Sequence, residues 1–292
     1  MTRALTVSVA GLGRAGSALL RECLDAPSVR VIGAWNRTER DLGAQGVELG
    51  ARLAWGGAGP PAQHLGAEIV LLAVADDSVQ AVCASLSAPP TTCVLHLSGA
   101  ADVSLLDGLR AGVPGCWHPL QAFSSGGRRS GVPPYAVALQ GPPAAVRCGR
   151  ALADALGHPA VELAANGRAA YHAAAVLASN CLVALEASAL RVMRSAGVSE
   201  AEGWQLLWPL VSGTLANLED GPRPSALTGP IARGDADTVR RNLAAIATDE
   251  KATDTYRALG AEAVDLAAEA GVEFGRLAAI RQMIACAAEG SD

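Results

Sequence analysis

Three glycines after the first apolar segment constrain the fold more than any other feature of this sequence. Residues 5–10 read LTVSVA, residues 11–16 read GLGRAG, and an apolar helical stretch follows. In a GxGxxG motif between strand and helix, the first glycine permits a tight turn, the second lets the backbone approach a pyrophosphate, and the third lets the helix pack on the strand. The helix N-terminus then faces the anion. The predicted cofactor contacts here are Gly11, Leu12, Gly13, Arg14, Ala15 and Gly16.

Short apolar strands alternate with helices through the first half of the chain. This alternation is typical of an α/β fold with a doubly wound, mostly parallel sheet. We therefore predict a Rossmann-like dinucleotide-binding domain over residues 1–164. Its expected strands are residues 5–10, 29–35, 52–55, 69–74, 93–97, 115–117, 135–139 and 160–163.

The texture of the sequence changes after Asn166-Gly167. Ala- and Leu-rich segments with helical spacing follow, without a strand pattern. Segment 221–234 is so rich in Gly and Pro that we expect a loop and no helix there. We interpret residues 165–292 as an all-helical domain for substrate binding and dimerisation. Its expected helices are residues 168–195, 200–218, 235–247, 251–270 and 273–287.

Composition limits the partners and the compartment. The aromatic fraction is 3%, which predicts a core of small side chains rather than large rings. The net charge of −5 gives no basic field, so we expect small-molecule or protein partners and no nucleic acid. Seven cysteines, odd in number and without a CxxC pair, indicate reduced cytoplasmic thiols rather than a disulfide framework or a metal site. They are residues 23, 83, 93, 116, 148, 181 and 286.

The uncharged stretch between Arg168 and Glu186 is the main candidate for a membrane span. It is short for that purpose and contains His172, Ser179 and Asn180. We therefore expect a buried helix and no membrane partner. The same stretch is apolar enough to support a homodimer.

The end of the second expected strand indicates which dinucleotide binds. The sequence there is Trp35-Asn36-Arg37-Thr38, without the Asp or Glu that NAD enzymes usually offer to the ribose 2′-hydroxyl. Arg37 can instead pair with a 2′-phosphate, and Asn36 and Thr38 can add hydrogen bonds. This pattern favours NADP(H). A solvated Arg37 on a loop is the alternative.

The next two strands end at the same edge of the sheet. Ligands of open α/β sheets lie across the carboxyl ends of the strands, so residues at these ends are expected to line the nicotinamide half of the cofactor. Asp77 is interpreted as a helix cap. The expected contacts are Val74, Ala75, Ser98 and Gly99.

Two histidines are candidate catalytic groups. His118 precedes Pro119, which prevents the strand from continuing, and can polarise a carbonyl or titrate near neutrality. His172 and Asn180 share a helix face with Ser179 by the three- and four-residue spacing. We predict His118, His172 and Asn180 as catalytic. A turn-capping His118, and hydrogen bonds between helices for His172 and Asn180, are the alternatives.

Four further residues are predicted to bind substrate. Thr228 and Arg233 offer a donor and a fixed cation in a flexible segment, although Arg233 could equally pair with Asp235 or Asp237. Gln121 follows His118 at the sheet edge, and Ser179 lies on the helix face described above. The predicted substrate contacts are Gln121, Ser179, Thr228 and Arg233.

Taken in order, several motifs resemble one family along nearly the whole chain. They are GLGRAGSAL at 11, WNRT at 35, LLAVADD at 71, LHLSGA at 95, HPLQAF at 118, YHAAAVLASN at 171 and ALTGPIARGD at 226. The family consists of two-domain bacterial NADP oxidoreductases with a Rossmann-like N-terminal domain and a helical C-terminal domain of unassigned function. It is similar to the group of 6-phosphogluconate, 3-hydroxyisobutyrate and prephenate dehydrogenases, ketopantoate reductase and pyrroline-5-carboxylate reductase, in many of which the helical domains pair.

One departure from that group limits what the resemblance implies. Its hydroxyacid dehydrogenases use a Lys four residues before an Asn, where this chain has Val176 before Asn180. Lys251, the only lysine, is expected at the surface of a later helix. Either His118 or His172 takes the role of that lysine, or the substrate needs none, as in imine reduction, or catalysis is lost.

We therefore predict an NADPH-dependent reductase of a small 2-oxo acid or imine, with ketopantoate suggested by the resemblance. Three alternatives stay open. They are a catalytically silent NADP-binding sensor or scaffold, a prephenate-like dehydrogenase, and a reductase exchanging hydride between NADP and a deazaflavin.

Overall fold

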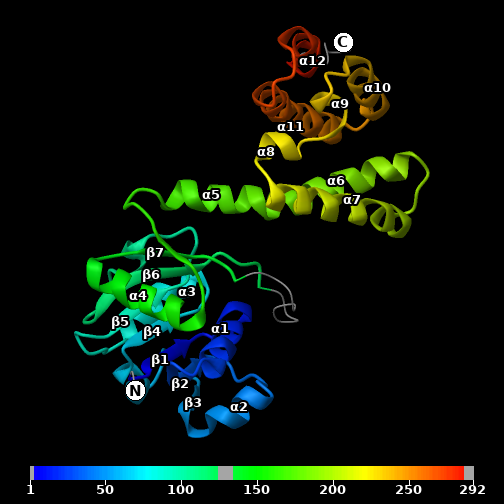
Figure 1. Ribbon diagram of the computed structural model, residues 1–292. Coiled ribbons are helices and arrows are strands. Elements are labelled where there is room, and N and C mark those ends of the chain that lie inside the picture. The colour runs from blue at the N-terminus through cyan, green and yellow to red at the C-terminus, as the bar shows by residue number, and fades with distance from the viewer. Residues whose placement is uncertain (1–2, 124–133, 286–292) are drawn as a thin grey trace. The chain divides into compact units, whose positions relative to one another are not determined.

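The computed structural model describes residues 3–123 and 134–285 and divides into two compact units, residues 1–177 and 178–292 (Figure 1). Cys286 and the end of the expected helix 273–287 lie outside the described residues. The helix that follows the sheet groups with the first unit, whereas the sequence placed it in the helical domain.

The first unit is built on one sheet of eight strands in the order β3-β2-β1-β4-β5-β6-β7-β8. Neighbouring strands are parallel except β6 and β7. The predicted Rossmann-like α/β fold class is confirmed, and each strand end lies within two residues of its expected position. The strands are β1 (Leu5–Ala10), β2 (Val29–Asn36), β3 (Leu53–Trp55), β4 (Ile69–Leu72), β5 (Cys93–His96), β6 (Val113–Pro119), β7 (Val137–Gln140) and β8 (Ala160–Glu162).

Both faces of the sheet are buried along its central strands. Along β4, Ile69 and Leu71 belong to one apolar cluster, and Val70 and Leu72 belong to the other. Such a continuous apolar run is what a parallel strand covered on both faces requires. The helices of this unit are α1 (Arg14–Asp25), α2 (Ala44–Leu49), α3 (Asp76–Ser85), α4 (Pro143–Leu156) and α5 (Arg168–Ala178), with short 3₁₀ turns at Gly50–Arg52, Ala62–Gly66 and Val103–Leu106.

Two expectations about the interior of this unit are wrong. Trp35 and Trp117 are fully buried, so the core does contain large rings. Cys93 at the start of β5 and Cys148 in α4 form a disulfide, because the packing of α4 on the sheet brings together two cysteines that are 55 residues apart in sequence. The expectation of reduced, packed cysteines holds for the buried free thiols of Cys23, Cys83 and Cys116.

The second unit is helical throughout its described residues, as predicted. Two short helices, α8 and α9, occupy the segment expected to be a loop. That expectation was wrong because Pro224 and Pro230 lie in the first turns, where the missing N–H of proline costs nothing. The helices are α6 (Asn180–Ser195), α7 (Glu200–Asp220), α8 (Arg223–Ala226), α9 (Gly229–Ala232), α10 (Ala236–Ile246), α11 (Glu250–Glu269) and α12 (Phe274–Ala285).

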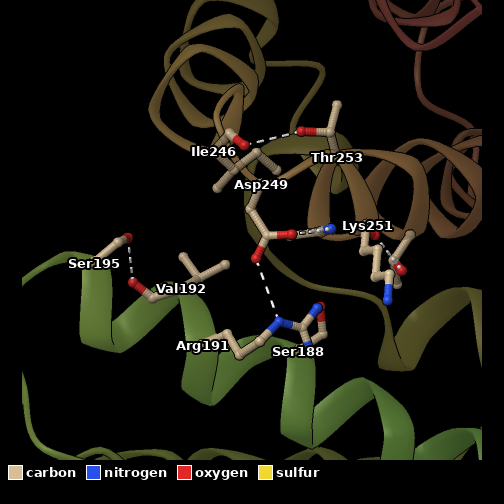
Figure 2. Close-up of polar contacts among 10 residues, drawn as sticks. Ser188, Arg191, Val192, Ser195, Ile246, Asp249, Lys251 and Thr253 are labelled. Atoms are coloured by element: carbon tan, nitrogen blue, oxygen red, sulfur yellow. Dashed lines mark hydrogen bonds and ion pairs between the residues drawn. The ribbon is translucent and has the colours of Figure 1, made fainter.

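Asp249, the N-cap of α11, connects three helices of the second unit (Figure 2). Its carboxylate accepts from the backbone N–H of Ala252 at 3.0 Å and pairs with Arg191 of α6 at 3.4 Å. The Thr253 hydroxyl donates to the carbonyl of Ile246, the last residue of α10, at 3.0 Å. Lys251 is exposed in the first turn of α11, as expected for a surface lysine.

The apolar stretch at residues 168–195 differs from its prediction in two ways. It consists of α5 and α6, which are separated at Ser179 by a non-helical backbone (φ −121°, ψ −70°). Only 6% of its most apolar window is buried, so the expected buried helix is instead largely exposed in the single chain. By length and composition alone, Arg168–Ser195 is also the one candidate membrane span among the described residues.

Exposed apolar side chains continue onto α7, the longest helix of the second unit. They include Trp204, Leu206, Trp208 and Leu210. A surface of this kind is typical of protein–protein contacts. The homodimer stays a prediction.

The turn between β1 and α1 yields the first test. A β-carbon added at Gly16 would lie 1.9 Å from the carbonyl oxygen of Gly11, whereas one added at Gly13 would meet nothing within 4 Å. We expect Gly16→Ala to lower the free energy of unfolding by about 1–3 kcal/mol, the usual cost of overpacking. Gly13→Ala should cost less than about 1 kcal/mol. Urea denaturation of both variants checks this, and equal losses would contradict the packing argument.

Candidate functional site

The glycine turn is held rigidly at the carboxyl edge of the sheet. Gly11 has a φ of +100°, and a β-carbon there would lie 2.6 Å from the carbonyl of Ala73. Its N–H donates to the Trp35 carbonyl at 2.7 Å, and the Leu12 N–H donates to Oδ1 of Asn36 at 2.9 Å. The turn therefore lies between β1 and β4, where the strand order reverses and α/β sheets bind their ligands.

The N-terminus of α1 fits a bound phosphate. Gly13 is its N-cap and offers no side chain, and the first turn contains no acidic residue. By contrast, α3 begins with Asp76 and Asp77. The first N–H groups of a helix need acceptors from outside it, and at α1 open space lies beside Gly13. Arg14 is exposed in the same turn, and Ala15 is half-buried.

The residues expected at the 2′-phosphate have different roles in the structure. The Asn36 amide accepts from Leu12 and donates from Nδ2 to the Thr38 carbonyl at 2.7 Å, so both its ends stabilise the turns. It is a positioning residue for the glycine turn. Arg37 and Thr38 are exposed, and Arg37 forms no ion pair with any described residue.

The ends of β4 and β5 are tied together. The Ser98 hydroxyl donates to the Asp76 carboxylate at 2.6 Å and accepts from the Ala101 N–H at 3.0 Å. Ser98 is thus buried and fully engaged, whereas Val74 is half-buried and Ala75 is exposed.

His118 and His172 converge on Gly99, which the sequence alone could not establish. A β-carbon at Gly99 would lie 2.7 Å from Nε2 of His118 and 3.0 Å from Nδ1 of His172. His118 comes from β6 and His172 from α5, and both belong to the first unit. Nδ1 of His172 is buried without a hydrogen-bond partner among the described residues. Glycine is required here because any side chain would collide with these rings.

Tyr171 is a member of this cluster that the sequence reading missed. Its hydroxyl is 2.7 Å from Nδ1 of His118, and the two rings meet edge to face at 5.6 Å. The signal in the sequence was its place beside His172 on a helix that follows the sheet. No sequence pattern indicated that Tyr171 contacts His118, because only the fold brings α5 to β6.

Burial keeps the His118–Tyr171 pair uncharged at neutral pH. Desolvation first, then the charges of Arg168 and His172, lower the pKa of His118 to about 4. Desolvation likewise raises the pKa of Tyr171 to about 12. Between a neutral imidazole and a neutral phenol, either the Tyr171 hydroxyl or the Nδ1–H of His118 can be the hydrogen-bond donor. Nε2 of His118 can therefore face Gly99 either as a donor or as an acceptor.

The remaining predicted residues belong to other elements. Gln121 is half-buried just beyond β6. Ser179, Asn180, Thr228 and Arg233 belong to the second unit, where all four side chains are exposed. Thr228 is the N-cap of α9 and Arg233 its C-cap.

A separate cavity of about 630 Å³ lies within the second unit. Its described lining is mostly apolar and contains no His, Cys, Asp or Glu side chain. The polar exceptions include Asn242, whose Nδ2 donates to the Tyr256 hydroxyl at 3.3 Å. The only titratable side chain in this described lining is Tyr256, whereas His118, Tyr171 and His172 lie together in the first unit, so we place the candidate chemistry at His118.

A family model described as a domain of unknown function, DUF2520, matches residues 135–286, more than half of the chain. The chain belongs to this family. The match begins just before β7 and includes the described helices of the second unit. No curated protein matches the sequence.

Solved structures with the same architecture cover almost the whole chain. Protein TM1727 from Thermotoga maritima is 20% identical, with a TM-score of 0.68 over 91% of this chain and 99% of its own. BF3122 from Bacteroides fragilis, provisionally assigned as an NADP oxidoreductase, is 17% identical, with a TM-score of 0.67 over 90% and 98%. A reductive aminase from Aspergillus terreus is 18% identical, with a TM-score of 0.54 over 97% and 93%. At these identities the likeness establishes the fold.

Two buried imidazoles make the stability of the fold depend on pH. The pKa values of His96 and His118 are both lowered from 6.5 to about 4, chiefly by desolvation. Nδ1 of His96 also accepts from the Ser98 N–H at 3.2 Å, a bond that protonation would break. Between pH 6.5 and 4 the unfolded chain thus binds more protons than the folded chain, so stability should fall as the pH falls through this window. Urea denaturation across the window measures the fall.

Titration of the histidine ring protons by NMR measures the pKa values of His96 and His118 separately. The variants His96→Gln and His118→Gln identify the two sets of signals. Both rings should stay neutral down to about pH 5. Signals from His96 and His118 that titrate near 6.5 would contradict it.

Proposed function

We propose that this protein is an NADPH-dependent reductase of a small imine or 2-oxo acid. The observation that carries the proposal is the convergence of His118 and His172 on Gly99, with Tyr171 bonded to His118, along the same sheet edge as the glycine turn. A dinucleotide whose pyrophosphate lies at Gly13 would extend along this edge, since β5 is two strand spacings, about 10 Å, from β1.

The local geometry supports NADPH as the cofactor. The uncapped N-terminus of α1 would hold the pyrophosphate, and the exposed Arg37 would pair with the 2′-phosphate. The Aspergillus terreus reductive aminase has been crystallised with NADPH. When bound, this cofactor supplies a hydride. The nicotinamide would lie near Gly99 and the two imidazoles, at the carboxyl end of β5.

The described side chains can position and protonate a substrate over Gly99. When the Tyr171 hydroxyl donates to Nδ1 of His118, Nε2 carries the proton and would donate to a carbonyl oxygen. When Nδ1 donates to the hydroxyl oxygen, Nε2 would accept from the N–H of an iminium. His172 would supply a second contact through its unpartnered Nδ1. The His118–Tyr171 bond fixes the imidazole ring, so little reorganisation is needed when charge develops.

Reduction of an imine is the reaction most consistent with Val176 at the position where related hydroxyacid dehydrogenases have a lysine. Val176 on α5 is half-buried and cannot transfer a proton, and Lys251 is exposed in the other unit. An iminium already carries the proton that a carbonyl must acquire, so its reduction requires no lysine acid. Ketopantoate stays a candidate among the 2-oxo acids.

Nucleotide binding is the first functional test. We expect the purified protein to bind NADPH more tightly than NADH in calorimetric titrations. Arg37→Asp should weaken NADPH binding by roughly 30-fold, the loss of about 2 kcal/mol for a charge-assisted contact, and should reverse the preference. Gly13→Ala should weaken both nucleotides while the fold persists, because its β-carbon would occupy the phosphate approach. If neither NADPH nor NADH binds, the proposed reductase is excluded.

The Tyr171 hydroxyl provides a test of the chemistry. Tyr171→Phe should reduce kcat/KM for imine reduction by about 10- to 100-fold, because His118 loses the partner that fixes its ring position. NADPH affinity should not change. Tyr256→Phe is the matched control, since it removes a hydroxyl from the second unit. Unchanged turnover in Tyr171→Phe would remove this hydroxyl from the mechanism.

A nucleotide-binding sensor without catalysis is the second candidate, and the missing lysine is the observation that favours it. Tight NADPH binding with no turnover of any imine or 2-oxo acid would support the sensor over the reductase.

A further inference from the structure

Arg168 is a buried cation whose charge no described residue neutralises. It is 3% exposed and opens α5, three residues before Tyr171. Its Nε donates to Oε1 of Gln140 at 3.3 Å, but Nη1 and Nη2 have no hydrogen-bond partner. None of the ion pairs among the described residues includes it. A buried charge without a partner is costly, so its persistence calls for an explanation.

Neighbouring side chains hold the guanidinium in place without neutralising it. Gln140 is itself fixed, because its Nε2 donates to the carbonyls of Ala164 and Ala165 at 3.0 Å each. The guanidinium carbon lies 5.7 Å from the centre of the Tyr171 ring. These contacts fix the orientation of the guanidinium and leave its two terminal nitrogens for another group.

The nearby carboxylates are already engaged. Asp76 accepts from the Ser98 hydroxyl at 2.6 Å, and Asp102 accepts from the backbone and side chain of Ser104. Both carboxylates keep their negative charge, but neither forms an ion pair with Arg168. Among the described residues, a direct ion pair with the two Nη atoms is therefore left for a ligand anion. A planar guanidinium with two parallel free nitrogens matches the two oxygens of a carboxylate.

The place of Arg168 in the fold separates it from the cofactor phosphates. It contacts Gln140 at the end of β7, four strand spacings, or about 19 Å, from β1 and the glycine turn. It lies beside His118 and Tyr171, and a second unpartnered buried atom, Nδ1 of His172, belongs to the same cluster. One small anionic ligand over Gly99 would supply acceptors to both.

We propose that Arg168 is the receptor for the carboxylate of the substrate, so that this site selects a 2-imino or 2-oxo acid over a neutral imine or ketone. The inference rests on the proposed reductase function and adds the substrate class to it. The carboxylate binds Arg168, and the adjacent C=N or C=O group then lies beside Nε2 of His118. Because both Nη atoms are buried, binding of the carboxylate requires the side chains around Arg168 to move.

A matched pair of cyclic imines tests this directly. The compounds are 1-pyrroline-2-carboxylate and 2-methyl-1-pyrroline, which differ by a carboxylate in place of a methyl group. Wild-type protein should prefer the carboxylate in kcat/KM by about 100-fold, and Arg168→Met should reduce that preference to within about threefold. Arg168→Lys, which keeps the charge but not the fork, should retain part of it. Arg150→Met is the control, since Arg150 of α4 only donates to the Ala160 carbonyl.

A binding measurement without turnover gives a second readout. Oxamate should raise the melting temperature of wild-type protein and of Arg150→Met but not that of Arg168→Met. Without ligand, Arg168→Met should melt at or above the wild-type temperature, because an unpaired buried charge is removed. A structural arginine would instead leave the variant destabilised.

The outcomes distinguish this inference from the proposed function. Turnover of both imines by wild-type protein with an unchanged preference in Arg168→Met would overturn the carboxylate receptor and leave the reductase intact. No turnover of either imine would overturn the reductase, while the oxamate shift would still test Arg168. If Arg168→Met does not fold, a smaller oxamate shift in Arg168→Lys than in wild-type protein, with competitive inhibition of wild-type protein by oxamate, would support the carboxylate receptor. An undiminished shift in Arg168→Lys would overturn it.

Discussion

The close approach of three backbone segments at the end of β1 is the constraint on which the first unit depends. Gly11 touches the Ala73 carbonyl, and Gly16 lies against Gly11, so the turn, β4 and α1 meet without intervening side chains. This contact directs the N-terminus of α1 along the carboxyl edge of the sheet. Asn36 then fixes the turn from the neighbouring strand through Leu12. The predicted anion site is thus a consequence of packing, because the packing leaves the N-terminus of α1 at Gly13 without a side-chain cap.

Desolvation is the main constraint on the cluster of His118, Tyr171 and Arg168. Arg168 is a permanent cation, and a protonated His118 beside it would place two like charges together. Desolvation first, and this repulsion second, keep the imidazole neutral, with a pKa of about 4. The cluster can therefore donate and accept hydrogen bonds at neutral pH, but it does not contain an imidazolium acid at His118.

Sequence patterns predicted the sheet well because its strands are separated by strong local signals. The eight apolar runs, the glycine turn and the change to helical spacing are all readable within short windows. The errors arose where distant packing or backbone geometry decides. Only the fold brings Cys93 to Cys148 and Tyr171 to His118. Likewise, periodicity continued through Ser179 although the helix does not, and prolines in segment 221–234 begin helices rather than prevent them.

The two features that distinguish this site, a neutral imidazole and an unpaired guanidinium, favour one kind of substrate when taken together. On the proposed function, an iminium of a 2-imino acid is positive at nitrogen and negative at its carboxylate. The lone pair of neutral His118 would accept from the iminium N–H, whereas an imidazolium would repel it. Arg168 would neutralise the other end. Val176 adds no further cation to α5, the helix that contains both Arg168 and His172.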